Sequence, residues 1–139
     1  MIRQANIEDA LFLYQIAQET GLSWSQKDFE DDLQLNRTIY FVSKEGFIGC
    51  QYILNEAEIT NIAVSTKYQG KGHAKALWQM MHSFFSEKHI DTCFLEVRES
   101  NESARRFYEK IGFRLMSTRK KYYKNPVEHA MIYRWKKDE

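Results

Sequence analysis

Residues 58–74 read EITNIAVSTKYQGKGHA, and this stretch decides what the rest of the chain can fold into. Residues 58–64 are rich in β-branched and apolar side chains, which is typical of a strand. Gly70 and Gly72 then break the pattern, and from Ala74 onward apolar residues recur at helical spacing. The stretch therefore predicts a strand, a glycine-bearing loop and a helix in direct succession.

The loop from Gln69 to Ala74 has the properties of an anion site. The first amides of a helix lack intrahelical partners, and the helix dipole adds partial positive charge at that end. Gly70 and Gly72 would let a phosphate approach these amides closely, and Lys71 adds a mobile positive charge. Taken alone, the loop is equally consistent with a tight turn, because it has neither the Walker pattern nor the dinucleotide fingerprint.

Upstream of this stretch the sequence predicts two helices and two more strands. Asn6 is a suitable cap for a first helix, which Gly21 ends, and Ser25 is a suitable cap for a second. Residues 38–42 and 47–53 have the composition of strands. The connections among these strands and the next are too short for crossovers, so we expect an antiparallel meander.

Downstream, residues 93–97 predict a compact, buried strand. A helix separates this strand from residues 58–64, so the connection between the two must be a crossover. We therefore expect Val64 and Val97 to end parallel neighbours.

The last part of the chain predicts one more helix and two final strands. Ser100 or Asn101 caps the helix and Gly112 ends it. Residues 113–116 and 130–135 are predicted as strands. The whole pattern indicates an α+β fold built on a mixed sheet.

Length and charge limit the classes of function. The 139 residues suit a single domain spanning 1–139. Lys and Arg total 20 against 19 for Asp and Glu, a net charge of +1, which argues against a dedicated nucleic-acid binder. No apolar run approaches the roughly 20 residues of a membrane span.

The cysteines and the N-terminus point to one compartment. Cys50 and Cys93 lie in strand-like apolar stretches and lack metal-site spacing, so we expect reduced core residues. The first residues show no signal-peptide pattern. We therefore expect a cytoplasmic protein.

Two motifs together resemble the GNAT superfamily of acetyltransferases. Gln69, Gly72 and Ala74 match the spacing of its pyrophosphate loop, and the segment from Leu95 to Phe113 matches its second motif. The resemblance implies a mixed, mostly antiparallel central sheet flanked by about four helices. It also implies acetyl-coenzyme A as co-substrate, no metal, and the following coenzyme contacts: Ile62, Ala63, Val64, Gln69, Gly70, Lys71, Gly72, His73, Ala74 and Asn101.

Within that superfamily, the chain is most similar to the bacterial ribosomal-protein-alanine N-acetyltransferases. The match implies Glu96 as general base and Tyr108 as general acid in a direct attack, with Trp24 and Tyr122 beside the acceptor. The implied partner is a protein or peptide N-terminus, here that of a small-subunit ribosomal protein, with no membrane or direct nucleic-acid role. Leu22-Ser23 and His129 depart from the pattern near the expected acceptor entrance.

The residues themselves suit this chemistry. A peptide α-ammonium has a pKa near ~8 and yields its proton readily to a positioned carboxylate such as Glu96. A phenol can protonate a departing thiolate, whose conjugate acid has a pKa near ~8.5. On the residues alone, however, Glu96 could be an ion partner for Arg98, Tyr108 a core tyrosine and Asn101 only a helix cap.

Other functions stay open at this point. A GNAT enzyme for a small amine, polyamine or lysine side chain is one, and a non-catalytic acyl-coenzyme A-binding domain is another. Residues 119–121 form a basic run that is solvated, or that contacts the coenzyme 3′-phosphate or ribosomal RNA. An acidic helix face, solvated or attractive to a basic peptide, is expected from Asp28, Glu30, Asp31 and Asp32.

Overall fold

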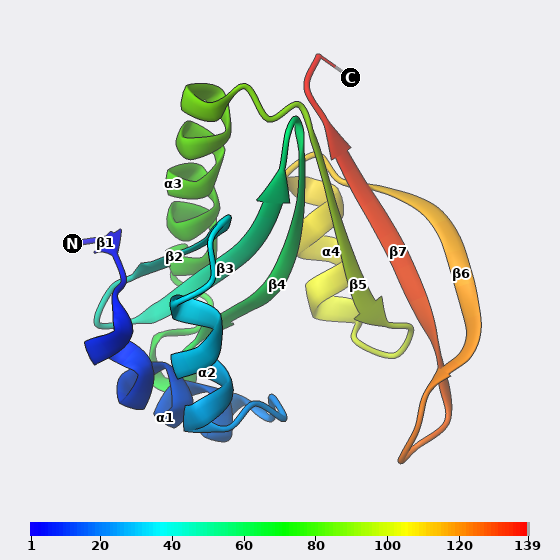
Figure 1. Cartoon of the computed structure of the whole chain (residues 1–139). Helices are drawn as coiled ribbons and strands as arrows, with labels where there is room; N and C mark the ends of the chain where they lie inside the picture. The colour runs from blue at the N-terminus through cyan, green and yellow to red at the C-terminus, as the bar shows by residue number, and fades with distance from the viewer. Residues whose placement is uncertain (139) are drawn as a thin grey trace.

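The computed structural model describes residues 1–138 and contains a seven-stranded sheet with helices on both faces (Figure 1). The helices are α1 (Ala10–Thr20), α2 (Gln26–Leu33), α3 (His73–Lys88) and α4 (Glu102–Lys110), with 3-10 turns η1 (Ile7–Asp9) and η2 (Thr66–Tyr68). The strands are β1 (Arg3–Gln4), β2 (Thr38–Val42), β3 (Gly46–Ile53), β4 (Glu56–Val64), β5 (Thr92–Arg98), β6 (Arg114–Tyr123) and β7 (Glu128–Lys136).

The sheet order is β1-β2-β3-β4-β5-β7-β6, and every neighbouring pair is antiparallel except β4 and β5. The expected meander and the mixed, mostly antiparallel sheet are therefore confirmed. The parallel pair is joined only where Glu56–Glu58 face Thr92–Phe94. The prediction that Val64 and Val97 lie at the ends of parallel neighbouring strands is confirmed. Beyond the paired residues β4 and β5 diverge (Figure 1), so Val64 and Val97 do not pair with each other.

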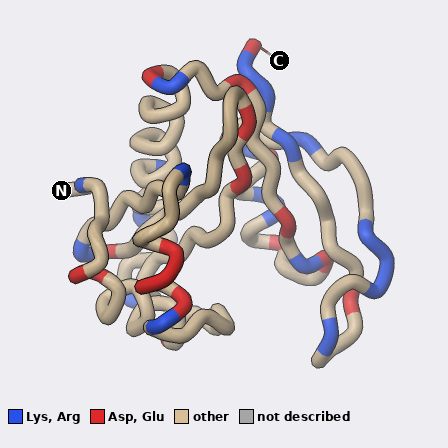
Figure 2. Tube along the Cα trace, in the orientation of Figure 1, with Lys and Arg blue, Asp and Glu red and all other residues tan. Residues whose placement is uncertain are grey.

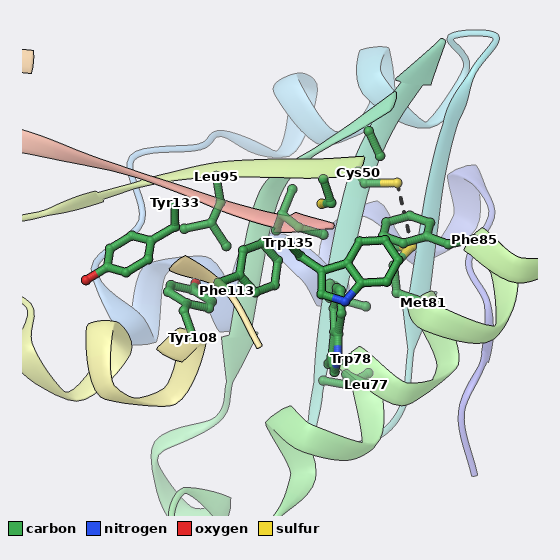
Figure 3. Close-up of a cluster of buried hydrophobic side chains, with 14 of the residues drawn as sticks. Cys50, Leu77, Trp78, Met81, Phe85, Leu95, Tyr108, Phe113, Tyr133 and Trp135 are labelled. Atoms are coloured by element: carbon green, nitrogen blue, oxygen red, sulfur yellow. Dashed lines mark hydrogen bonds between the residues drawn. The ribbon is translucent and has the colours of Figure 1, made fainter. Parts of the chain in front are cut away.

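Apolar side chains form two cores, one on each face of the sheet. The larger core packs α3 and α4 against the sheet, and Trp78 and Trp135 meet in it with ring centroids 5.8 Å apart (Figure 3). The smaller core packs α1 and α2 around Phe29 and Phe47. β4 serves both cores, since Val64 faces the larger and Ala63 the smaller.

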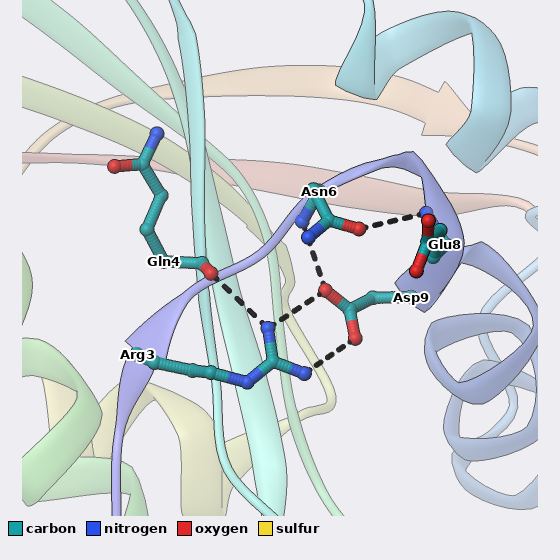
Figure 4. A network of polar contacts seen from close by, with 5 residues as sticks. All are labelled: Arg3, Gln4, Asn6, Glu8 and Asp9. Atoms are coloured by element: carbon teal, nitrogen blue, oxygen red, sulfur yellow. Dashed lines mark hydrogen bonds and ion pairs between the residues drawn. The ribbon is translucent and has the colours of Figure 1, made fainter.

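The helix starts confirm the capping predictions. Asn6 and Ser25 each form a reciprocal capping box, and Gly21 ends α1 with a left-handed φ of 83°. The short strand β1 was not predicted. Arg3 of β1 pairs with Asp9 at 2.7 Å in a polar network at the start of the chain (Figure 4).

Two predictions about the chain need correction. The strand predicted at residues 113–116 extends to Tyr123, where β6 still pairs with β7. Nearly every residue of β6 is exposed, so its sequence lacks the alternation of apolar and polar residues that marks a half-buried strand. Asp32 does not join an exposed acidic face. It is buried, and its carboxylate accepts hydrogen bonds from the Tyr40 hydroxyl and the Gln51 amide.

Candidate active site

The glycine loop and the start of α3 form one side of the site. Gly70 and Gly72 have φ values of 78° and 88°, in the region that favours glycine, and a Cβ at either position would meet open space. Gly72 is the N-cap of α3 and has no side chain to occupy the first amides of the helix. The glycines are thus required by the backbone, and the exposed helix start suits an anion.

A cavity of about 520 Å³ opens from this loop between α3 and α4. It is lined by six of the residues predicted to contact the coenzyme, namely Val64, Gln69, Gly70, Gly72, His73 and Ala74. Trp78, Phe107 and Trp135 add aromatic surface. A helix start suited to an anion, joined to an apolar cleft, has the properties needed for a long ligand with a charged end and an apolar arm.

The remaining predicted coenzyme residues lie outside that lining. Lys71 is exposed beside the loop, Ile62 packs on the larger core and Ala63 on the smaller. Asn101 caps α4, because its Oδ1 accepts the Ala104 amide at 3.3 Å.

Two side chains fix the shape of the loop. The Gln69 amide donates to the Val64 carbonyl at 2.9 Å, which ties the loop to the end of β4. His73 Nδ1 lies 3.9 Å from Glu45 Oε1. Gln69 thus positions the loop through its backbone contact as well as lining the cavity.

Glu96 lies on the opposite face of the sheet from α3 and α4. Its neighbours Leu95 and Val97 are buried in the larger core, so the Glu96 side chain projects the other way, as predicted from alternation. It accepts a hydrogen bond from Arg119 at 3.2 Å. The alternative partner Arg98 is instead engaged by Glu128 at 3.0 Å.

Tyr108 is 9% exposed and packs in the larger core near Phe113 and Tyr133 (Figure 3). Burial raises the pKa of its phenol, with smaller contributions from Cys93 and Tyr123. A tyrosine phenol is protonated at neutral pH without any such shift, and the raised pKa makes it a weaker acid. Tyr108 is therefore a core residue whose hydroxyl carries a proton.

The two predicted acceptor residues lie in different clusters. Trp24 is half-buried against Phe29, with ring centroids 5.1 Å apart, at the edge of the smaller core. Tyr122 is exposed on β6, where the Arg119 guanidinium stacks over its ring at 4.0 Å.

Sequence reasoning missed two residues near Glu96. Burial raises the pKa of Glu58, and the charge of Glu96 raises it further. Burial likewise raises the pKa of Tyr123, again with a contribution from Glu96. Glu58 carried the same signal as Glu96, an acidic residue in an apolar strand, whereas nothing separated Tyr123 from its neighbour Tyr122.

Comparison with known proteins identifies relatives of this chain. The model of the "Acetyltransferase (GNAT) family" matches residues 9–113. The ribosomal protein bS18-alanine N-acetyltransferase of Haemophilus influenzae is 40% identical over 140 residues, covering 95% of each chain.

Solved structures show the same likeness. The crystal structure of the ribosomal-protein-S18-alanine N-acetyltransferase from Escherichia coli superposes with a TM-score of 0.88 at 30% identity, over 98% of this chain and 92% of that one. NAA60 of Arabidopsis thaliana in complex with acetyl-CoA shares the fold, with a TM-score of 0.89 at 16% identity over 100% and 99% of the two chains. Within residues 1–138, none of the helices has the length and apolar character to cross a membrane.

Proposed function

The chain belongs to the GNAT acetyltransferase family, and from that premise we propose that it transfers an acetyl group from acetyl-coenzyme A to the N-terminal alanine of ribosomal protein bS18. The 40% identity to an enzyme named for this reaction, along 95% of the chain, is the observation that carries the proposal. The proposal includes the cytoplasmic location expected from the sequence.

The cavity between α3 and α4 fits the coenzyme. The amides at the start of α3, with Lys71 beside them, would hold the pyrophosphate, and the cleft along Val64, Phe107 and Trp135 would hold the apolar arm. When bound, acetyl-coenzyme A supplies an activated acetyl group and a thiol leaving group.

Two side chains of this chain carry out the proton transfers of the reaction. Glu96 lies on the face of the sheet opposite α3 and α4, which we call the acceptor face. It takes the proton of the α-ammonium so that the amine can attack the acetyl carbonyl. The protonated hydroxyl of Tyr108 donates to the sulfur as the C–S bond breaks. A positioned acid or base of this kind typically contributes ~10²–10⁴-fold in rate.

An α-amine suits this arrangement better than a lysine side chain. Its pKa near ~8 lies more than two units below the ~10.4 of lysine, so one carboxylate base is better matched to it. Tyr122 on β6 would line the path of the acceptor peptide, and Trp24 its other wall.

A competition assay tests the acceptor. One peptide carries a free N-terminal alanine, and the matched peptide is blocked there but bears a lysine. We expect the free alanine to be acetylated faster per unit concentration. Faster acetylation of the blocked peptide, or of spermidine, would reject the ribosomal acceptor and leave a GNAT enzyme for another amine.

A further inference from the structure

Three charged side chains from three different strands lie on the acceptor face of the sheet, and two of them are in contact. Glu58 lies on β4 opposite Phe94 of β5, at the last paired position before these strands diverge. Glu96 follows two residues later on the same face of β5. Arg119 reaches Glu96 from β6 with Nη1 3.2 Å from Oε1.

The charge of Glu96 acts on Glu58. Burial raises the pKa of Glu58 and the negative charge of Glu96 adds to that shift. Two neighbouring carboxylates disfavour joint ionisation, and the raised pKa makes Glu58 the one that retains a proton to higher pH. A general base, in contrast, must be ionised when the acceptor binds.

Arg119 is a cation in direct contact with the Glu96 carboxylate. Its guanidinium stacks on the Tyr122 ring at 4.0 Å while it bonds Glu96, so one planar group is held from two sides. Figure 2 shows the basic segment of β6 and the acidic positions on β4 and β5.

The other charged groups on this face have different positions. Arg98 bonds Glu128 and stacks on Tyr123 at 4.4 Å. Burial raises the pKa of Tyr123 on β6, and the charge of Glu96 adds to that shift. Arg134 of β7 is in register with Phe94, whereas the residue opposite Glu96 is Ile132.

We propose that Arg119 is a positioning residue: through its ion pair it holds the Glu96 carboxylate in one orientation on the acceptor face and stabilises its ionised form. This proposal rests on the proposed function, because Glu96 matters as a base only if an amine is acetylated. Arg119 itself does not transfer a proton.

The first test reads the carboxylates without substrate. Protein labelled with ¹³C at the glutamate side-chain carboxyl is titrated by NMR, and Glu58→Gln and Glu96→Gln assign the two signals. In Arg119→Gln we expect the apparent titration of the Glu58–Glu96 pair to move up by about one pH unit. Lys120→Gln, which removes the same charge one residue away on the exposed strand, is the matched control and should move it far less.

Two further variants separate positioning from a structural role. In Arg119→Gln/Glu58→Gln the like charge is gone, so the titration of Glu96 should return toward its wild-type midpoint. Arg119→Lys keeps the positive charge and should restore most of the wild-type titration. The acid limb of the kcat/KM profile for the alanine peptide should shift and recover in parallel.

An unchanged titration of the pair in Arg119→Gln would overturn the proposal. A shift that Glu58→Gln fails to reverse would overturn it as well. If the wild-type enzyme acetylates no alanine peptide, the proposed function fails, but the carboxyl titration still gives its own answer on Arg119.

Discussion

The proposed coenzyme side and the proposed acceptor side of this molecule are built in opposite ways. The coenzyme side is made mainly of backbone from consecutive residues, in which Gly70 and Gly72 expose the start of α3. The acceptor side is made of side chains from distant segments, with Glu58, Glu96 and Arg119 brought together by the sheet. Backbone sites depend on local conformation, whereas side-chain sites depend on topology and on balanced charge.

The largest expected effect lies on the acceptor side. Glu96→Gln should lower turnover by ~10²–10⁴-fold while coenzyme affinity stays unchanged, because it removes the base and leaves the cavity intact. The deficit should shrink as pH rises and more acceptor is already neutral. Steady-state kinetics and calorimetry measure the two quantities, with exposed Glu99→Gln as control. Wild-type turnover at neutral pH in Glu96→Gln would remove it from the mechanism.

Tyr108→Phe should have a smaller effect, about 10²-fold in turnover, at the low end for a positioned acid. The reason is that a thiolate whose conjugate acid has a pKa near ~8.5 already leaves readily. An acyl donor with a more acidic thiol should narrow the gap between variant and wild type. A gap that is the same for both donors would assign Tyr108 to packing alone, and Tyr14→Phe serves as control.

On the coenzyme side the effect should be about tenfold. Gly72→Ala places a Cβ at a φ of 88°, a strain of roughly 1–2 kcal/mol that the loop relieves by moving its amides. Coenzyme affinity should fall accordingly in calorimetry. Gly21→Ala, at a φ of 83° and also facing open space, carries the same strain away from the site and should bind normally. Equal losses in the two variants would contradict the loop assignment.

The smallest effect is expected at an ion pair outside both regions. Asp9 has a lowered pKa, because it bonds Arg3 in the network of Figure 4. A lowered pKa in the folded state stabilises the fold above the usual carboxyl range, and this contribution is lost as pH falls through the folded pKa. Asp9→Asn should therefore lower Tm by a few degrees at neutral pH, with the difference from wild type vanishing in acid. Acetylation should be unaffected, in contrast to Arg119→Gln.

The same contrast explains what the sequence could predict. Helix starts at Asn6 and Ser25, the meander and the loop before α3 depend on neighbouring residues, and their patterns were sufficient. The length of β6 could not be predicted from the sequence, because an exposed edge strand lacks the alternation of apolar and polar residues.

The acceptor side was harder to predict for a related reason. Asp32 was assigned to an exposed face, since the phenol of Tyr40 that makes its burial favourable lies on another element. Glu96 and Tyr108 were selected through family resemblance, and their roles remain predictions. Recognising that Glu58 and Arg119 lie near Glu96 required the sheet order, which joins β4, β5 and β6 across intervening helices and strands.

The divergence of β4 and β5 also has a consequence for solubility. Because the two strands stop pairing after Glu58 and Phe94, the sheet contains a pair of edges in its interior as well as those at its sides. An unpaired edge is a template for another extended chain, and natural sheets protect such edges by covering them. A ligand seated along this opening would do so, and occupancy of the opening would then influence how readily the protein aggregates.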